Sequence, residues 1–261
     1  MLKFQELNLN SINSNLKFIN DKVQIYNENA MYQLNKIEEK TIDIICTDLP
    51  YGCTKNKWDL IIPVEYMWEK FNKIIKDNGV IVLTATQPFA SILIGSNLDN
   101  FKYDLIWEKT ISSGQLNVKN QPLRSHEHIL VFYKQKPTYN EQKMPGTPYS
   151  INRKVKNNEN NYNKQKDSFK VNDGFRHAKS VIKISNPRIK GGHPTQKPIE
   201  LIDYILKTYS NENDLVLDCC MGSGTTAESA IKLNRRFYGI EILESEYNKT
   251  LERINAINAL K

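Results

Sequence analysis

Short apolar segments rich in isoleucine and valine alternate along this chain with segments of helical periodicity. This alternation is typical of an α/β fold, in which helices cover both faces of a mostly parallel sheet. The expected strands are 22–26, 42–47, 80–84, 105–108, 129–133, 215–218 and 237–240. With 261 residues, of which 39% are hydrophobic, the chain is long enough to build one large core of this kind.

Helical segments connect several of the expected strands. Residues 63–76 place their apolar side chains on one stripe, with Pro63 in the first turn and Gly79 just past the end. A second amphipathic segment begins at Pro198, and residues 245–260 can form a last helix. We expect all three to pack against the sheet.

The helical and strand patterns stop between residues 134 and 190, where Asn, Lys, Gln, Pro and Gly prevail. A loop of this length inside a compact domain is usually functional or disordered, and we expect no part of the sheet core in it. We therefore divide the chain into residues 1–134 and 191–261, which form the α/β domain, and an inserted region, 135–190.

Positive charge is concentrated around this insertion. The formal net charge is +7, but residues 110–190 contain 16 Lys and Arg against 5 Asp and Glu, which gives +11 there and −4 in the rest of the chain. The same segment carries aromatic residues among its cations, including Tyr133, Tyr139, Tyr149, Tyr162, Phe169 and Phe175. The mixture suits phosphate neutralisation together with contacts to bases. A solvated, disordered insertion has the same composition, so composition alone leaves both interpretations open.

The sequence disfavours a membrane protein, a secreted protein, and a protein built around disulfides or a metal site. No run of about 18 apolar residues occurs, and the start, MLKFQELNLN, lacks the basic and then apolar layout of a secretion signal, so we expect a soluble, cytoplasmic protein. The four cysteines lack paired ligand spacing, and we expect reduced, mostly buried thiols rather than a disulfide framework or a metal site. They are Cys46, Cys53, Cys219 and Cys220.

Two polar motifs each follow an apolar strand. IDIICTDLPYG (42–52) leads into Asp48, and LVLDCCMGSGTT (215–226) leads through Asp218 into a glycine turn. Ligands of open α/β sheets bind outside the carboxyl ends of the strands, where the strand order reverses. Two such ends placed side by side would form one cleft.

The turn at Gly222 and Gly224 allows the backbone to approach a ligand closely, and the helix after it offers free N–H groups. It is not a phosphate-binding P-loop, because no lysine precedes its hydroxyl residues. Glu241 follows about 20 residues later at the end of the next expected strand, where an acid can accept hydrogen bonds from a ribose. The pair suggests an adenosyl cofactor. An ordinary βαβ turn with a surface glutamate is the alternative.

In their order along the chain, these motifs resemble those of the β-class DNA amino-methyltransferases. In that family a D/N/S-P-P-Y/F/W motif comes first, a target-recognition region follows, and the cofactor motif comes last. Here DLPYG (48–52) precedes the basic insertion, HPTQKP (193–198) and DCCMGSGTT (218–226). The stretches TATQPF, YDLIWEK and HEHILVFYK resemble the family's intervening strands, so the resemblance covers nearly the whole chain apart from the insertion.

The resemblance implies the fold, the cofactor and the role of each of the three regions. The fold would be a Rossmann-like methyltransferase fold with circularly permuted motif order, and the cofactor would be S-adenosyl-L-methionine. Residues 1–134 would form the catalytic half, 135–190 the target-recognition region, and 191–261 the cofactor-binding half.

Four positions depart from the family's motifs. Leu49 replaces the first proline of DPPY, a variant found in a phage-like and bacterial subgroup. Cys219 and Cys220 replace Pro-Phe at the floor of the cofactor site. Asn29, in YNENA, stands where the family's YNGDC has an acid that contacts the cofactor adenine, and Cys53 stands in place of Thr.

The resemblance assigns the chemistry to DLPYG. The lone pair of an exocyclic base amine is delocalised into the ring, so the amine needs acceptors for its hydrogens before it can attack a methyl sulfonium. Asp48 and the Pro50 carbonyl would accept those hydrogens, and Tyr51 would stack on a base rotated out of the duplex. The predicted catalytic residues are Asp48, Leu49, Pro50 and Tyr51. An acidic first residue is more typical of adenine enzymes, so the expected target is N6 of adenine.

The remaining site residues are also expectations from the resemblance. Thr195 and Lys197 of HPTQKP would lie near the methionine carboxylate, with a simple turn before a helix as the alternative. The predicted cofactor residues are Asn29, Thr195, Lys197, Asp218, Gly222, Ser223, Gly224, Thr225 and Glu241. The predicted DNA contacts are Lys55, Trp58, Arg124, Arg153, Arg176 and Arg188. Most such cations contact only phosphate, and packing is the alternative for Trp58.

Three other functions remain open at this point. They are methylation of cytosine N4, methylation of RNA by an enzyme with a related motif, and a catalytically silent nucleic-acid-binding relative of the family. The expected partner is duplex DNA with a flipped target base, and no membrane. The resemblance also leaves open a homodimer and a cognate restriction endonuclease in a restriction-modification system.

Overall fold

The chain divides into two compact units, residues 1–140 together with 180–261, and residues 141–179. The structure, a computed structural model, describes residues 17–50, 62–154, 167–186 and 196–259. Within these ranges no helix has both the length and the apolar character required to cross a membrane.

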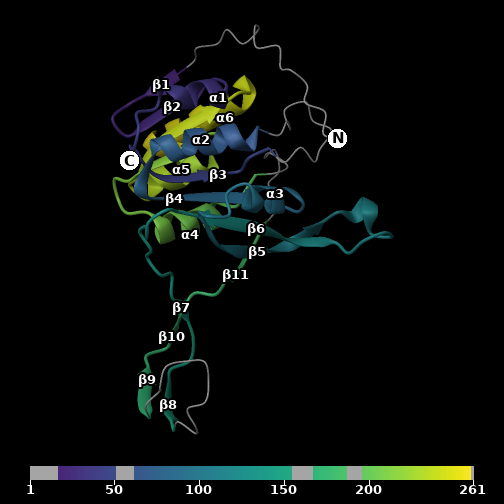
Figure 1. Cartoon of the computed structure of the whole chain (residues 1–261), viewed down its shortest axis with the longest axis vertical. Coiled ribbons are helices and arrows are strands. Elements are labelled where there is room, and N and C mark those ends of the chain that lie inside the picture. Colours follow the sequence, from purple (N-terminus) through teal and green to yellow (C-terminus); the bar gives the residue numbers. More distant parts are fainter. Residues whose placement is uncertain (1–16, 51–61, 155–166, 187–195, 260–261) are drawn as a thin grey trace. The chain divides into compact units, whose positions relative to one another are not determined.

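A nine-stranded sheet forms the centre of the larger unit, in the order β1-β2-β13-β12-β3-β4-β6-β5-β11 (Figure 1). Its strands are β1 (Lys17–Ile19), β2 (Val23–Asn27), β3 (Ile42–Thr47), β4 (Ile75–Ala85), β5 (Phe101–Ser113), β6 (Arg124–Phe132), β11 (Val181–Ile184), β12 (Leu215–Asp218) and β13 (Arg236–Glu241). The five strands from β2 to β4 run parallel. β6 runs antiparallel to β4 and β5, β1 antiparallel to β2, and β11 parallel to β5. The predicted mostly parallel sheet is confirmed.

Helices cover both faces of this sheet, as the alternation predicts. One core lies beneath α4 (Ile199–Tyr209), α5 (Thr225–Lys232) and α6 (Glu244–Ala259). The other lies beneath α1 (Ala30–Gln33), the 3-10 turn η2 (Leu34–Lys36), α2 (Val64–Ile74) and α3 (Phe89–Gly95). Val82 belongs to the first core and Ile81 and Leu83 to the second, because successive strand side chains point to opposite faces.

The junction between α2 and β4 differs from the prediction. Residue 75 is the first residue of β4 rather than part of a helix that continues to 76. Gly79 lies inside β4 and caps no helix. A Cβ at Gly79 would lie 2.5 Å from a side-chain carbon of Ile75 and 3.0 Å from the Asp43 carbonyl, so the glycine is required by close packing within the strand.

Among the elements of the larger unit that the sequence does not predict are β1, α1, α3 and β11. α3 follows β4 after a short turn, and its seven residues are too few for a clear helical period. β11 lies within the insertion predicted at 135–190, yet pairs with β5 along its whole length. The expectation that this region contributes nothing to the sheet was therefore wrong for Val181–Ile184, whose four residues resemble any short loop in sequence.

In the described residues of the smaller unit, 141–179, the strands form two antiparallel pairs. β7 (Met144–Pro145) pairs with β10 (Phe175–Arg176), and β8 (Tyr149–Arg153) pairs with β9 (Ser168–Asn172). The side chains of Phe169 and Val171 on β9 are 67% and 71% exposed. The described part of this unit therefore presents apolar surface on β9.

Candidate active site

The carboxyl ends of β3 and β12 lie side by side at the centre of the sheet. The two strands pair directly, with Leu217 opposite Ile45. At their ends, the Thr47 hydroxyl donates a hydrogen bond of 2.7 Å to Oδ1 of Asp218. The chain leaves β3 through α2 to β4 on one side, and leaves β12 through α5 to β13 on the other. The strand ends that carry the two motifs thus meet where the strand order reverses, as their positions in the sequence predict.

Asp48 follows β3 directly, and its carboxylate contacts the side chains of Thr84 and Lys197. The Thr84 hydroxyl, buried near the end of β4, donates to Oδ1. Nζ of Lys197 lies 2.5 Å from Oδ2. The Asp48 side chain is 32% exposed and that of Lys197 only 9%. A ligand at this edge can therefore reach the Asp48 carboxylate, whereas Lys197 is covered.

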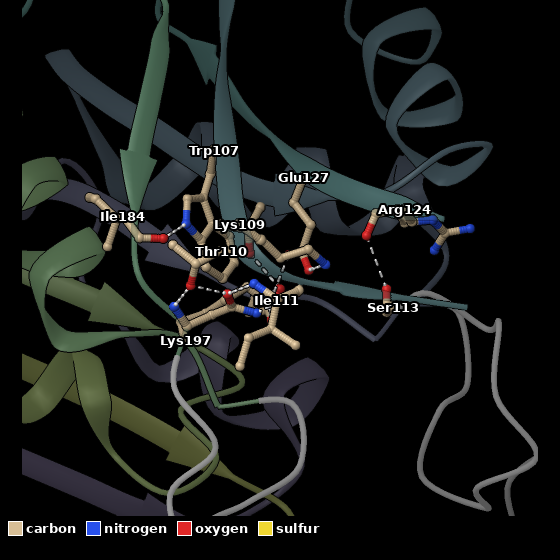
Figure 2. Close-up of polar contacts among 12 residues, drawn as sticks. Trp107, Lys109, Thr110, Ile111, Ser113, Arg124, Glu127, Ile184 and Lys197 are labelled. Carbon is tan, nitrogen blue, oxygen red and sulfur yellow. Dashed lines mark hydrogen bonds and ion pairs between the residues drawn. The ribbon is translucent and has the colours of Figure 1, made fainter. Parts of the chain in front are cut away.

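Lys197 belongs to a row of charges that alternate in sign. Its Nζ lies 3.3 Å from Oε2 of Glu127, and Oε1 of Glu127 lies 3.0 Å from Nζ of Lys109. Figure 2 shows Lys109, Glu127 and Lys197 beside the paired strands β5 and β6. Burial by itself raises the pKa of Glu127, but the ammonium groups of Lys197 and Lys109 outweigh burial and hold that pKa below its usual value.

The remaining residues of DLPYG contribute differently. Leu49 is buried in the core beneath α2, so the residue that replaces the motif's first proline packs rather than faces a ligand. Pro50 is half-buried. Five predicted site residues lie outside the described residues: Tyr51, Lys55, Trp58, Arg188 and Thr195.

Asp218 is an almost fully buried carboxyl at the end of β12. Its Oδ1 accepts hydrogen bonds from the Thr47 hydroxyl and, at 3.1 Å, from the backbone N–H of Cys220. Burial raises its pKa from the usual 3.8 to about 6, although these hydrogen bonds act in the opposite direction. Cys219 is buried beside Thr47, with its sulfur 3.7 Å from the Thr47 hydroxyl. The residue that replaces the family's proline therefore fills the core.

The glycine turn after Asp218 adopts a left-handed backbone. Gly222 has φ +51° and Gly224 has φ +83°. The backbone N–H of Gly222 donates 2.8 Å to Oε2 of Glu241, and the N–H of Leu243 donates 2.8 Å to Oε1. Burial raises the pKa of Glu241, partly offset by these two hydrogen bonds. Glu241 therefore ties the end of β13 to the turn.

The turn has the open space and the donors that an adenosyl cofactor requires. A Cβ at Gly222 would meet no atom within 4 Å, whereas a Cβ at Gly224 would overlap the Thr250 side chain. α5 begins at Thr225, so its first N–H groups follow the turn directly. The Ser223 hydroxyl donates 3.2 Å to Oε1 of Gln196, which brings the residue before Lys197 to the turn. The described residues therefore fit the cofactor that the motifs imply.

Asn29 lies at the same edge but has a local partner. Its Oδ1 accepts a hydrogen bond of 2.8 Å from the N–H of Met31 and so caps α1. The preceding residue, Glu28, donates its N–H to the Glu241 carbonyl at 3.1 Å. The segment after β2 therefore reaches the end of β13, and a cofactor contact from Asn29 remains a prediction.

The described arginines predicted to bind DNA lie on different elements. Arg124 begins β6 and is exposed, with its carbonyl 3.5 Å from the Ser113 hydroxyl (Figure 2). Arg153 ends β8 and is exposed in the smaller unit. Arg176 is engaged within that unit, where its guanidinium stacks 4.7 Å from the Tyr149 ring centre and donates to the Thr147 carbonyl. Of the two arginines in this unit, Arg153 is the more exposed.

Thr84, Lys109 and Glu127 were not predicted as site residues. They come from three different strands, and nothing in their local sequence distinguishes them from ordinary strand residues. TATQPF and HEHILVFYK marked their segments through the family resemblance, but only the pairing of β4, β5 and β6 brings these three side chains to Asp48 and Lys197.

Comparison with known proteins agrees with this arrangement. The family model of N6/N4 methyltransferases, described as DNA methylase, matches residues 42–252. The type II methyltransferase M1.MboII of Moraxella bovis is 31% identical over 247 residues, which cover 86% of this chain and 93% of that protein. The DNA adenine methyltransferase YhdJ of Escherichia coli (strain K12) is 29% identical over 252 residues, 89% of this chain and 82% of the relative.

Solved structures share the fold. The complex of M1.HpyAVI with S-adenosyl-methionine has a TM-score of 0.62 at 24% identity, and covers 89% of this chain and 99% of that one. The cytosine-N4-specific PvuII DNA methyltransferase has a TM-score of 0.66 at 15% identity, with 89% and 86% covered. The chain therefore belongs to the N6/N4 DNA methylase family and is a DNA methyltransferase that uses S-adenosyl-L-methionine.

Proposed function

We propose that this enzyme methylates N6 of adenine at a specific site in duplex DNA. The observation that carries the proposal is the position of Asp48, a partly exposed carboxylate fixed by Thr84 and Lys197 beside the strand that leads into the glycine turn. Such a carboxylate can accept a hydrogen from an amine presented at the carboxyl edge of the sheet.

The residues of DLPYG prepare the amine for attack. Asp48 and the Pro50 carbonyl accept its two hydrogens, so its lone pair is withdrawn from the ring and points along the line of attack. Tyr51 stacks on the base, which must leave the duplex before its amine can reach the site. S-Adenosyl-L-methionine, when bound, supplies an electrophilic methyl group on its sulfonium. No covalent bond to the protein is needed.

Residues of the C-terminal half and Asn29 hold the cofactor in this proposal. Glu241 accepts hydrogen bonds from the ribose hydroxyls with the lone pairs that its contacts to Gly222 and Leu243 leave available. The turn and the start of α5, with Asp218, Ser223, Gly224 and Thr225, border the adenosyl group. Thr195 and Lys197 lie toward the methionine carboxylate, and Asn29 toward the adenine.

Adenine is favoured over cytosine by two observations. The first residue of the motif, Asp48, is acidic, and that is more typical of the family's adenine enzymes. One relative, 29% identical, is named as a DNA adenine methyltransferase. The cytosine-N4-specific PvuII enzyme shares the fold, so cytosine N4 is the second candidate.

Nucleoside analysis tests the target base. The protein is incubated with tritium-labelled S-adenosyl-L-methionine and DNA from a host without methyltransferases, and the DNA is digested to nucleosides. We expect the label in N6-methyl-2′-deoxyadenosine. Label in N4-methylcytosine would move the assignment to cytosine, and labelled RNA in a competition with single-stranded RNA would change the polymer. No label in either polymer would favour a catalytically silent relative.

In this proposal the DNA contacts come from the insertion and from segments outside it. The residues are Arg153, Arg176 and Arg188 in the insertion, and Lys55, Trp58 and Arg124 outside it.

Sequencing DNA from cells that express the chain reveals the recognised site. Sedimentation of the free enzyme and of its DNA complex distinguishes a monomer from a homodimer. A cognate restriction endonuclease and a cytoplasmic location are consistent with the type II relatives and belong to the same proposal.

A further inference from the structure

We propose that Glu127 is a positioning residue for methyl transfer, which acts by holding the Lys197 ammonium against Asp48. The proposal rests on the function proposed above, because its effect is exerted on the carboxylate that accepts the amine hydrogen. Nothing in the motifs assigns a role to Glu127, which lies in β6, next to β4 in the sheet.

Burial requires the four charges to stay paired. The side chains of Lys109, Lys197 and Glu127 are 7%, 9% and 13% exposed. Glu127 lies between the two ammonium groups, 3.0 Å from one and 3.3 Å from the other. Removing its charge would take away the carboxylate that lies between these two buried ammonium groups. Lys197 would then move, and the orientation of Asp48 would change with it.

Glu127 is itself held by the strands around it. On β5 and β6 it lies directly opposite Trp107, on the same face of the sheet as Lys109. Nζ of Lys109 stands 5.8 Å from the centre of the Trp107 ring. The Trp107 indole N–H donates 3.0 Å to the Ile184 carbonyl of β11 (Figure 2). A series of contacts therefore extends from β11 through Trp107 and Lys109 to the Glu127 carboxylate.

A flexible lysine needs this second anchor. The four-carbon side chain of Lys197 can reach one carboxylate in many conformations, and a single ion pair does not select among them. Contacts with both Asp48 and Glu127 select one position for Nζ. Since misplacement of a reacting group by about 1 Å can cost on the order of a hundredfold in rate, loss of this selection should be visible in methyl transfer.

A double-mutant cycle tests the proposal. Glu127→Gln, Lys197→Met and the double variant are compared with the unaltered enzyme at saturating cofactor, in single turnovers on DNA that carries its recognised site. We expect Glu127→Gln to slow transfer by about tenfold or more. In the Lys197→Met background the same change should have less than about a twofold effect, because the group through which Glu127 acts is gone. Because Lys197 is also assigned to the methionine carboxylate, the rates are compared at saturating cofactor, which separates the transfer step from an altered cofactor affinity.

Glu108 provides a matched control. It neighbours Trp107 on β5 but lies on the opposite face, where its carboxylate is 43% exposed and pairs with Lys183 at 3.1 Å. Glu108→Gln removes the same charge from the same sheet and should leave the transfer rate unchanged. Glu127→Asp keeps the charge on a side chain that is one methylene shorter, and it should fold and show an intermediate rate. It is used in place of Glu127→Gln if that variant does not fold.

Two results would overturn the proposal. One is that Glu127→Gln transfers the methyl group as fast as the unaltered enzyme. If Glu127→Gln does not fold, the same result for Glu127→Asp would overturn it. The other is multiplication of the single effects in the double variant, which would mean that Glu127 acts independently of Lys197. Failure of the unaltered enzyme to methylate DNA contradicts the proposed function instead, and is thereby distinguished from failure of this inference.

Discussion

The Asp218 carboxyl illustrates how one buried group makes the stability of this enzyme depend on pH. Its pKa in the folded chain is about 6, above the usual 3.8, because burial disfavours the charged form. The folded chain therefore binds this proton more tightly than the unfolded chain. The stabilising contribution is complete below the unfolded value and is lost as the pH rises toward the folded value. Near pH 8 the charged group costs on the order of 3 kcal/mol.

The substitution Asp218→Asn should therefore stabilise the protein at high pH. An amide keeps the acceptor for Thr47 and for the Cys220 N–H but carries no charge. We expect the free energy of unfolding to rise by about 1–3 kcal/mol relative to the unaltered protein at pH 8, and the gain to diminish as the pH falls toward 4. Urea unfolding at the two pH values measures this. A gain that does not depend on pH would show that the charge of Asp218 is not its cause.

At the scale of elements, the two glycines of the glycine turn, Gly222 and Gly224, have different roles that the sequence alone does not distinguish. Gly224 faces Thr250 on α6, and a Cβ added at Gly224 would lie 2.6 to 3.0 Å from Thr250 atoms, whereas a Cβ added at Gly222 would face open space. Gly224 therefore serves packing between α5 and α6. Gly222 has room for a ligand beside it.

Alanine at each glycine should have a different effect. Gly224→Ala combines a left-handed backbone with overlap, so we expect a loss of about 2–4 kcal/mol of unfolding free energy. Gly222→Ala should cost about 1–2 kcal/mol from the backbone alone, yet weaken cofactor binding by on the order of tenfold or more because the new methyl group occupies the open space. Denaturant unfolding and calorimetric titration of the cofactor measure the two effects. Undiminished cofactor affinity in Gly222→Ala would remove that glycine from the cofactor site.

The sequence predicts the elements of the sheet better than their connections. β3 and β12 are mostly buried, and the largely apolar segments IDIICT and LVLD mark their bounds residue for residue. The end of α2 was misplaced because Ile75 continues the apolar stripe of the helix while its backbone is already extended. β11 was missed because half of its residues are exposed, and its pairing with β5 depends on a strand more than 70 residues away.

At the scale of the whole molecule, positive charge is concentrated in the smaller unit. Residues 141–179 contain nine Lys and Arg against four Asp and Glu. If this unit contacts the DNA backbone, each cation at the interface contributes to the dependence of affinity on salt.

A charge reversal in this unit tests that contact. In the double variant Arg153→Glu and Lys170→Glu, on the paired strands β8 and β9, we expect the KM for DNA to rise by about tenfold or more at moderate salt. The plot of log affinity against log salt should become less steep, while cofactor affinity should not change. Equal DNA affinity and an equal salt slope in the variant would place the DNA elsewhere on the enzyme.

The active site is predictable from the sequence only in part. Asp48 and Asp218 could be placed together, because both follow parallel strands and such ends share one edge of a sheet. The hydroxyl of Thr84 and the charges of Lys109 and Glu127 could not, since their approach to Asp48 and Lys197 depends on antiparallel pairing among strands that local sequence does not specify. The role of Asn29 was inferred from a motif, while its side chain caps the helix that it precedes.

The central claim is that Asp48 acts on the target amine within a site whose cofactor contacts lie on other residues. It is tested most directly by measuring methyl transfer and cofactor affinity in Asp48→Ala, with Asp77→Ala as a control at an acid that is 62% exposed and pairs with Lys40. We predict loss of transfer by about a thousandfold or more in Asp48→Ala, with a cofactor dissociation constant within about threefold of the unaltered enzyme, and no change in the control. Transfer by Asp48→Ala at a rate comparable to that of the control would contradict the account.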